Sequence, residues 1–245
     1  MSLLAQIDNL SEADKSRAVK QLITESTPDF DFFLLVTLSV LMATFGLLID
    51  SASVVIGSML IAPILSPILS ISLGLVMSDN KLLMRSLYTV FKASVIGIVA
   101  AMLATLLFKS LLSDGLTNEI IARTAPSLIY FFIAVVSGFA VAYTLVKPDL
   151  SETLPGIAVA VALIPPLSVV GIGIAYFDSS VVSGSLTLYL INIVGIVFAS
   201  MIGFSLMNLY GKRKVAETAI KHEEKRLEEE EKQAEKFKEK NQAEA

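Results

Sequence analysis

Two proline-containing apolar stretches decide the fold of this chain: Gly57-Ser-Met-Leu-Ile-Ala-Pro63-Ile-Leu-Ser-Pro67 and Leu163-Ile-Pro165-Pro166-Leu-Ser-Val-Val-Gly171-Ile-Gly173. Each lies in an apolar segment long enough to cross a bilayer, which takes about 20 residues. A proline inside a helix removes a backbone hydrogen bond and clashes with the preceding turn. Lipid cannot satisfy the freed carbonyl, so helix breaks are tolerated only where protein or a water-lined cavity surrounds them. Paired breaks therefore point to a site for a solute.

Composition supports a membrane protein and excludes several kinds of chemistry. Of the 245 residues, 54% are hydrophobic and 17% are charged, and most charges lie in residues 1–31 and 212–245. The sequence has no cysteine, which excludes disulfides, thiolate metal sites and cysteine nucleophiles. The one histidine, His222, lies in the charged tail. We expect no cofactor, no metal site, no nucleic-acid partner and no cleavable signal peptide.

The apolar residues form six segments, which predict an all-α membrane protein with six transmembrane helices. The segments cover residues 32–49, 52–77, 87–112, 126–146, 153–177 and 184–210. They divide the chain into an N-terminal part (1–31), a transmembrane domain (32–210) and a charged tail (211–245). In the first part, Ser11 followed by Asp14 and an apolar face predicts a capped amphipathic helix that Pro28 ends. The tail should be helical, as a solvated helix or as a contact with a partner or sister subunit.

Lysine and arginine near the segment ends predict the orientation. With six spans both termini lie on one side, and that side has the larger number of basic residues: Lys15, Arg17, Lys20, Lys81, Arg85, Lys147, Lys212, Arg213 and Lys214. The other side has Lys109 and Arg123. We therefore expect a multi-pass protein of the inner (plasma) membrane with both termini in the cytoplasm.

The two proline stretches occupy matching places in two halves of the chain. Aligning Leu60-Ile-Ala-Pro63 with Leu163-Ile-Pro165-Pro166 puts each break in the second span of a three-span unit, 32–112 or 126–210. In this alignment the next aspartate follows Pro63 by sixteen residues and Pro166 by twelve, a difference of about one helical turn. Because three spans is an odd number, homologous units would be inverted relative to each other. The prediction is two inverted three-helix repeats whose second and fifth helices are broken at proline.

The same residues resemble a known family. The run from Gly46 to Pro67, the run from Leu154 through Pro165-Pro166, and Tyr189-Leu-Ile-Asn192 are similar to the prokaryotic membrane family called domain of unknown function 389. The resemblance covers most of residues 32–210. It implies the membrane fold and brings no established activity. The chain departs from the family in its short N-terminal part and in Asp50, where members usually hold asparagine.

Candidate site residues follow from the breaks and from the rare polar groups in the apolar segments. At the breaks they are Ser58, Pro63, Ser66, Pro67, Pro165, Pro166 and Ser168, with the amide of Asn192 in the last segment. Lys92 is the ionisable exception, and it either snorkels to the cytoplasmic surface or faces a pore. Asp50 and Asp149 lie at the two mouths, as attractants for cations or as solvated turns and caps. Such a site of backbone and hydroxyl dipoles could serve either charge or a small polar solute.

Three functions remain open at this stage. The first is a small-solute or ion transporter or channel, with a permeation site between the two proline-broken helices. The second is a membrane scaffold without transport that recruits a partner through its charged tail. The third is an intramembrane enzyme using a Ser–Lys pair with Lys92, which the absence of histidine and cysteine from the spans disfavours. We expect no enzyme, and we expect a homo-oligomer in the lipid bilayer.

Overall fold

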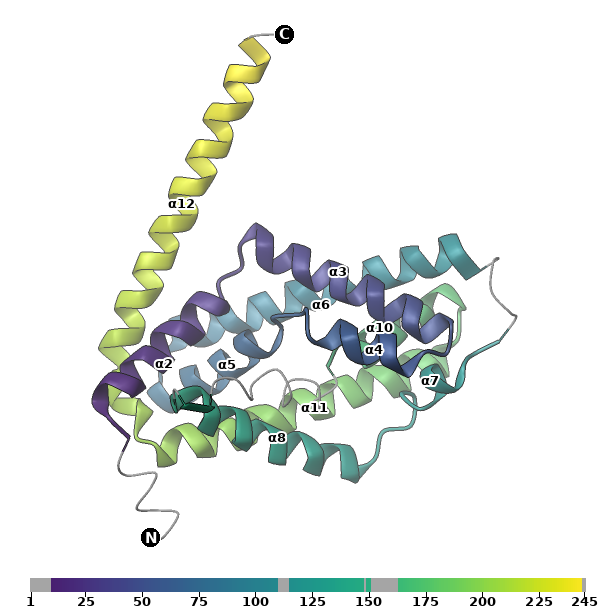
Figure 1. Cartoon of the computed structure of the whole chain (residues 1–245), viewed down its shortest axis with the longest axis horizontal. Coiled ribbons are helices and arrows are strands. Elements are labelled where there is room, and N and C mark those ends of the chain that lie inside the picture. Colours follow the sequence, from purple (N-terminus) through teal and green to yellow (C-terminus); the bar gives the residue numbers. More distant parts are fainter. Residues whose placement is uncertain (1–9, 110–114, 148, 151–162, 244–245) are drawn as a thin grey trace.

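The computed structural model describes residues 10–109, 115–147, 149–150 and 163–243, and within them the regular structure is helical. Figure 1 shows an elongated helical body with one long helix, α12, projecting from one end. Helix α2 lies at the same end, and helix α7 lies at the other. We call these the α12 end and the α7 end of the body.

Among the described residues, four helices are long and apolar enough to cross a membrane: α3 (Phe30–Leu48), α6 (Asn80–Phe108), α8 (Leu128–Val146) and α11 (Ser179–Leu206). Each exposes large apolar side chains on its outer face, for example Leu38, Phe91, Phe132 and Phe198. A soluble protein rarely exposes apolar area on this scale, whereas lipid favours it. The regular structure of the described residues is therefore all helical and compatible with a multi-pass membrane protein.

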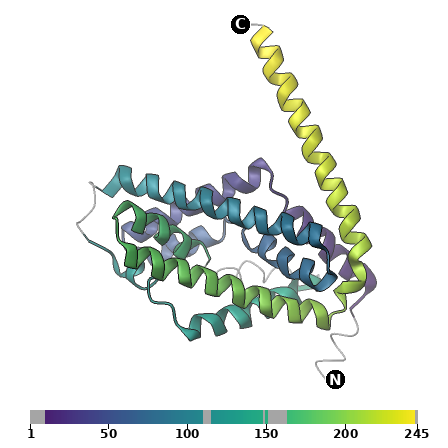
Figure 2. The same ribbon diagram turned by 180° about the vertical axis from the view of Figure 1, so that it is seen from behind.

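The remaining helices of the body are too short to cross a membrane alone. They are α4 (Ala52–Met59), α5 (Leu65–Met77), α7 (Asn118–Ile121) and α10 (Ile164–Ala175). Helices α5 and α10 each pack against both α6 and α11, and Figure 2 shows them between these two long helices. The predicted second segment is thus two helices, α4 and α5, with Pro63 between them. The first half of the predicted fifth segment falls largely on residues 151–162, outside the described residues.

Helices α6 and α11 begin earlier than the apolar segments predicted, and their N-caps explain why. The side chain of Asp79 accepts from the backbone N–H groups of Lys81 and Leu82, and Asp178 does the same at α11. An N-cap aspartate satisfies otherwise unpaired donors and starts a helix before its apolar run begins. The first two residues of each helix are polar, Asn80 and Lys81 in α6 and Ser179 and Ser180 in α11, which is why an apolar window began later.

The turns α5–α6 and α10–α11 are built alike. In each, a glycine carbonyl accepts from the N–H of the capping aspartate five residues later at 2.9 Å: Gly74 with Asp79, and Gly173 with Asp178. The residue before each aspartate, Ser78 or Phe177, is left-handed. This is the Schellman arrangement for ending a helix. A Cβ on either glycine would meet the next helix within about 3 Å, so the close approach requires glycine there.

Helices α8 and α11 pack through small residues. A Cβ on Gly195 would lie 2.7 Å from the Cβ of Ala134, and one on Gly138 would lie 2.8 Å from the Cα of Ile196. Stripes of small residues let helix backbones approach where lipid supplies no hydrophobic driving force between helices. The periodic alanines and glycines of the sequence therefore serve helix packing here.

The two flanking helices pack on each other. Helix α2 (Glu12–Glu25) is capped by Ser11, whose hydroxyl accepts from the N–H of Asp14, and it buries Ala18, Val19, Leu22 and Ile23. Helix α12 (Arg213–Ala243) follows a short 3₁₀ helix, η3 (Leu209–Lys212). Its first turns pack against α2 and bury Ala216 and Ile220. The part of α12 beyond Glu228 whose side chains are described is exposed and projects from the body (Figure 1).

Candidate functional site

The break between α4 and α5 is a tight turn of five residues. The last turn of α4 is tightened by two hydrogen bonds between residues three apart. The N–H of Leu60 donates to Gly57 O at 3.3 Å, and the N–H of Ile61 donates to Ser58 O at 3.2 Å. Pro63 brings no N–H of its own, and Pro67 lies in the first turn of α5, where a proline is tolerated. The helix therefore stops at Met59 and starts again at Leu65.

A cavity of about 350 Å³ adjoins this break, and we call it the break cavity. Its walls come from the break, from the first turns of α5, from α2 and from α8. The lining residues are Met59, Leu60, Ile61, Ala62, Pro63, Leu65, Ser66, Leu69, Leu22, Glu25, Val141 and Leu145. The volume lies at the lower end of the range for small-molecule sites, about 300–1,000 Å³, and apolar walls with a few polar groups are typical of them.

Helix α2 is joined to α5 beside the cavity by two side-chain contacts. The hydroxyl of Ser66 donates to Glu25 Oε2 at 2.9 Å, and the hydroxyls of Ser26 and Ser70 lie 2.9 Å apart. Ser66 and Ser70 are one turn apart on α5, so consecutive residues of α2 meet one face of that helix. The end of α2 is thereby fixed against the break.

The predicted residues of the first break lie in different environments. Pro63 and Ser66 line the break cavity. Ser58 is buried and donates to Val55 O at 2.6 Å, and its own carbonyl accepts from Ser39 at 2.6 Å. Pro67 is buried in α5. Ser58 and Pro67 therefore support the walls, while Pro63 and Ser66 face the space.

The predicted residues of the second stretch are buried in helices. Pro165 and Pro166 lie in the first turn of α10, and Ser168 donates to Ile164 O at 3.1 Å. Asn192 is buried in α11. None of these four is among the residues that line the break cavity. The cavity thus lies beside the first break, between α2 and α8. The sequence had instead predicted a site between the two broken helices.

The predicted ionisable residues lie away from the cavity. The Lys92 ammonium is 4.5 Å from the ring centroid of Phe33, in the first turn of α3. The Asp50 carboxylate accepts from the N–H of Glu119 at 2.8 Å and from the Asn118 amide at 2.9 Å, and these bonds hold its pKa below the usual range. Asp149 is exposed. The described residues contain no group of three acidic or histidine side chains that could hold a metal ion.

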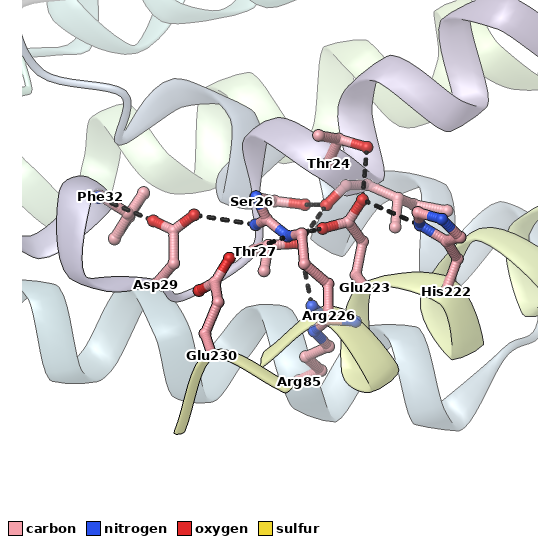
Figure 3. Close-up of polar contacts among 11 residues, drawn as sticks. Thr24, Ser26, Thr27, Asp29, Phe32, Arg85, His222, Glu223, Arg226 and Glu230 are labelled. Carbon is pink, nitrogen blue, oxygen red and sulfur yellow. Dashed lines mark hydrogen bonds and ion pairs between the residues drawn. The ribbon is translucent and has the colours of Figure 1, made fainter. Parts of the chain in front are cut away.

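Sequence reasoning missed Glu25 and a polar cluster at the α12 end of the body. Figure 3 shows this cluster where α2, the start of α3, α6 and α12 meet. Arg226 of α12 contacts Asp29 at 2.9 Å and Glu223 at 3.0 Å, Thr24 donates to Glu223 at 3.0 Å, and Arg85 donates to Thr27 at 3.0 Å. The contacts between helices join residues up to 199 positions apart, so no local pattern could have predicted them, whereas the Glu223–Arg226 pair is an i, i+3 contact within α12.

Comparison with known proteins places the chain in a family without assigning an activity. The family model described as Domain of unknown function (DUF389) matches residues 59–198, which is more than half of the chain. An uncharacterized protein of Methanocaldococcus jannaschii is 32% identical over 175 residues, which cover 70% of this chain and 52% of the relative. The chain thus spans about half the length of the curated relative it matches.

No solved structure matches the chain. The family match includes the break between α4 and α5, helix α8, the two Schellman turns and most of α11. Helix α2, which lines the cavity through Leu22 and Glu25, lies before the matched residues. The chain therefore belongs to the family described as domain of unknown function 389.

Proposed function

We propose that this protein is a multi-pass membrane transporter or channel for a small solute, and that the solute binds in the break cavity. The observation that carries the proposal is the cavity itself, which adjoins an interrupted helix in an apolar bundle. Interrupted helices in membranes are tolerated where protein or a water-lined cavity surrounds the break. In secondary transporters such breaks supply the substrate site.

We also propose that the body consists of two inverted three-span units. Three features of α5–α6 recur in α10–α11 at a constant offset of 99 residues: the N-caps Ile64 and Leu163, the Schellman glycines Gly74 and Gly173, and the capping aspartates Asp79 and Asp178. Helix α5 ends at the α12 end of the body and α10 at the α7 end (Figure 1). Equivalent helices that run in opposite directions support inversion.

The hairpins favour a different register from the alignment of Pro63 with Pro166. At an offset of 99 residues, Pro67 pairs with Pro166, and both lie in the first turn of their helices, twelve residues before the capping aspartate. Pro63 then belongs to the connection before α5. In this register the proline common to both units begins a half-helix.

The basic residues and the positions of the ends support an orientation. Helices α2 and α12 and the first two turns of α6, which carry Lys81 and Arg85, lie at one end of the body (Figure 1). Cytoplasmic ends of membrane proteins carry an excess of lysine and arginine. We propose that the α12 end faces the cytoplasm and that the protein resides in the inner membrane.

Reconstitution of the full chain in liposomes tests the proposal. We expect flux of at least one solute in a panel of small cations, anions and neutral polar molecules, and reduced flux for Pro63→Ala with Pro166→Ala. If protein-containing liposomes conduct no member of the panel, and the double variant behaves like the wild type in the host, the transport proposal is wrong.

A scaffold function is the second candidate, and the exposed part of α12 favours it. A helix that projects from the body and carries many charges can bind a partner without transport. The scaffold predicts that removing residues 229–245 abolishes the cellular phenotype. A transporter keeps its flux under the same truncation, because the contacts of α12 with Thr24 of α2 and with Asp29 lie before residue 229.

A further inference from the structure

The break cavity carries charge of one sign. Among the described residues that line it, Glu25 is the one ionisable residue. Its carboxylate accepts from the Ser66 hydroxyl at 2.9 Å and from the Gln21 amide at 2.8 Å. Neither partner neutralises the charge, because both are uncharged donors. The cavity therefore has a formal charge of minus one.

The packing of α2 places this carboxylate beside the cavity. Leu22 and Ile23 of α2 are buried, and Ser26 meets Ser70 one residue after Glu25. The Glu25 side chain itself is exposed, and its bonds to Ser66 and Gln21 hold it at the cavity. Glu25 therefore lies at the exposed edge of the cavity, on a helix outside the apolar segments.

The size and walls of the cavity exclude a bare ion as the best-fitting ligand. A water molecule occupies about 30 Å³ in the liquid, so the cavity of about 350 Å³ holds far more than one dehydrated ion. Most of its lining is aliphatic, including Leu65, Leu69, Val141 and Leu145. Aliphatic walls favour a ligand with an apolar body.

The helix ends at the break contribute opposite preferences. The carbonyl end of α4 lies at Met59 and favours a cation, while the amide end of α5 lies at Leu65 and favours an anion. The amide end already has an anion close by, because Glu25 is bonded to Ser66 in that first turn. The balance of charge thus favours a cation.

We propose that the break cavity binds a small organic monocation, with Glu25 as its counter-charge, Ser66 as a polar contact and the aliphatic walls around its body. The inference rests on the proposed function, since it names the class of solute for that same site. An anion would meet the carboxylate at short range, and a neutral solute would leave it without a counter-charge.

Three ligands with the same body and different charge test the proposal: n-butylammonium, n-butanol and butyrate. The natural chain has no cysteine, so Ala62→Cys places a single thiol in the cavity wall. The rate at which a maleimide labels this thiol in the purified full chain reports occupancy at pH 7. We expect n-butylammonium to slow labelling in a saturable way, and butyrate to have no effect at the same concentrations. Leu145→Cys, on the α8 wall, repeats the measurement if Ala62→Cys does not fold.

Glu25→Gln removes the charge and keeps a group that can bond Ser66. We expect it to weaken protection by n-butylammonium about tenfold, as is typical when a charged partner is lost. Asp31→Asn is the matched control, because Asp31 is an exposed carboxylate at the start of α3 and is not among the lining residues. In this control, n-butylammonium should slow labelling as strongly as it does in the cysteine variant without a second substitution.

Two failures are distinguishable. If butyrate protects as well as n-butylammonium, or if Glu25→Gln leaves protection unchanged, the cation inference is wrong while a solute site in the cavity stands. If none of the three ligands slows labelling at either cysteine, the cation inference is again overturned, and the cavity loses its support as the solute site.

Discussion

Asp50 shows how one side chain ties distant segments together. It ends the turn after α3 in a left-handed conformation, with φ of 55°, and its carboxylate holds the start of α7 through Glu119 and Asn118. Thr117 adds a bond to Leu47 O at 2.6 Å. Asp50, which the sequence placed at a mouth of the pathway, is thus held by the segment that leads to α8. These contacts account for an acidic residue at this position without a bound solute.

Asp50→Asn should destabilise the protein at neutral pH and leave it unchanged in acid. Bonds to Glu119 N–H and Asn118 lower the pKa of Asp50 from 3.8, so its contribution to stability is present above that value and is lost as pH falls through the lowered pKa. Asparagine tolerates the left-handed backbone, so the substitution removes charge without strain. Thermal unfolding in detergent between pH 7 and pH 2 measures this, and parallel curves for the two proteins would contradict it.

Helix packing at the element scale depends on the smallest residues. Gly195→Ala adds a Cβ that would lie 2.7 Å from the Cβ of Ala134 and 3.1 Å from Phe131 O, so α8 and α11 must separate. Overpacking of this kind costs about 1–3 kcal/mol. Gly211→Ala is the matched control, because nothing lies within 4 Å of the added atom. We expect lowered denaturation midpoints for Gly195→Ala alone, and equal midpoints would show that the two helices pack less closely.

The junction of α2 and α12 depends on Arg226. Arg226→Met leaves Glu223, whose side chain is 6% exposed, without its cation, and breaks the contact with Asp29. Because Arg226 is partly exposed, we expect a cost of about 1–3 kcal/mol, between the values for surface and buried pairs. Arg213→Met, which loses only an exposed pair with Glu217, should cost far less.

Limited proteolysis reports this junction directly. We expect cleavage between α12 and the body to be faster in Arg226→Met than in Arg213→Met, since the first variant loosens the helix where Thr24 and Glu223 meet. Adding Glu223→Gln should recover part of the loss, because it removes the unpaired buried charge. Equal cleavage rates in all three proteins would show that apolar packing through Ile220 alone holds the tail.

For the whole molecule, local sequence patterns predicted the long helices and the first break, but not how the helices pack together. Apolar runs located α3, α6, α8 and α11, because helix-length apolar segments need no tertiary information. Pro63 located the break, because its missing N–H acts within one turn. The position of α2 could not be predicted, because Glu25 and Ser66 are 41 residues apart and neither lies in a sequence pattern that predicts contact with the other.

The register of the two proposed repeats was predictable only in part. Pro63 and Pro67 are four residues apart, so either could pair with Pro166 on sequence alone. The capped turns at Asp79 and Asp178 favour Pro67, because they place both prolines in the first turn of a helix. A site between the broken helices was expected from the proposed symmetry, whereas the cavity lies between the first break, α2 and α8.

Solute flux through a filled cavity tests the central claim most directly. Ala62→Leu places a larger side chain in the wall of the break cavity, and Ala125→Leu makes the same change at an exposed position before α8. With a solute that the wild-type liposomes conduct, we predict that Ala62→Leu lowers flux at least about tenfold, which corresponds to about 1.4 kcal/mol, while Ala125→Leu conducts like the wild type. Wild-type flux in a correctly folded Ala62→Leu variant would contradict the account.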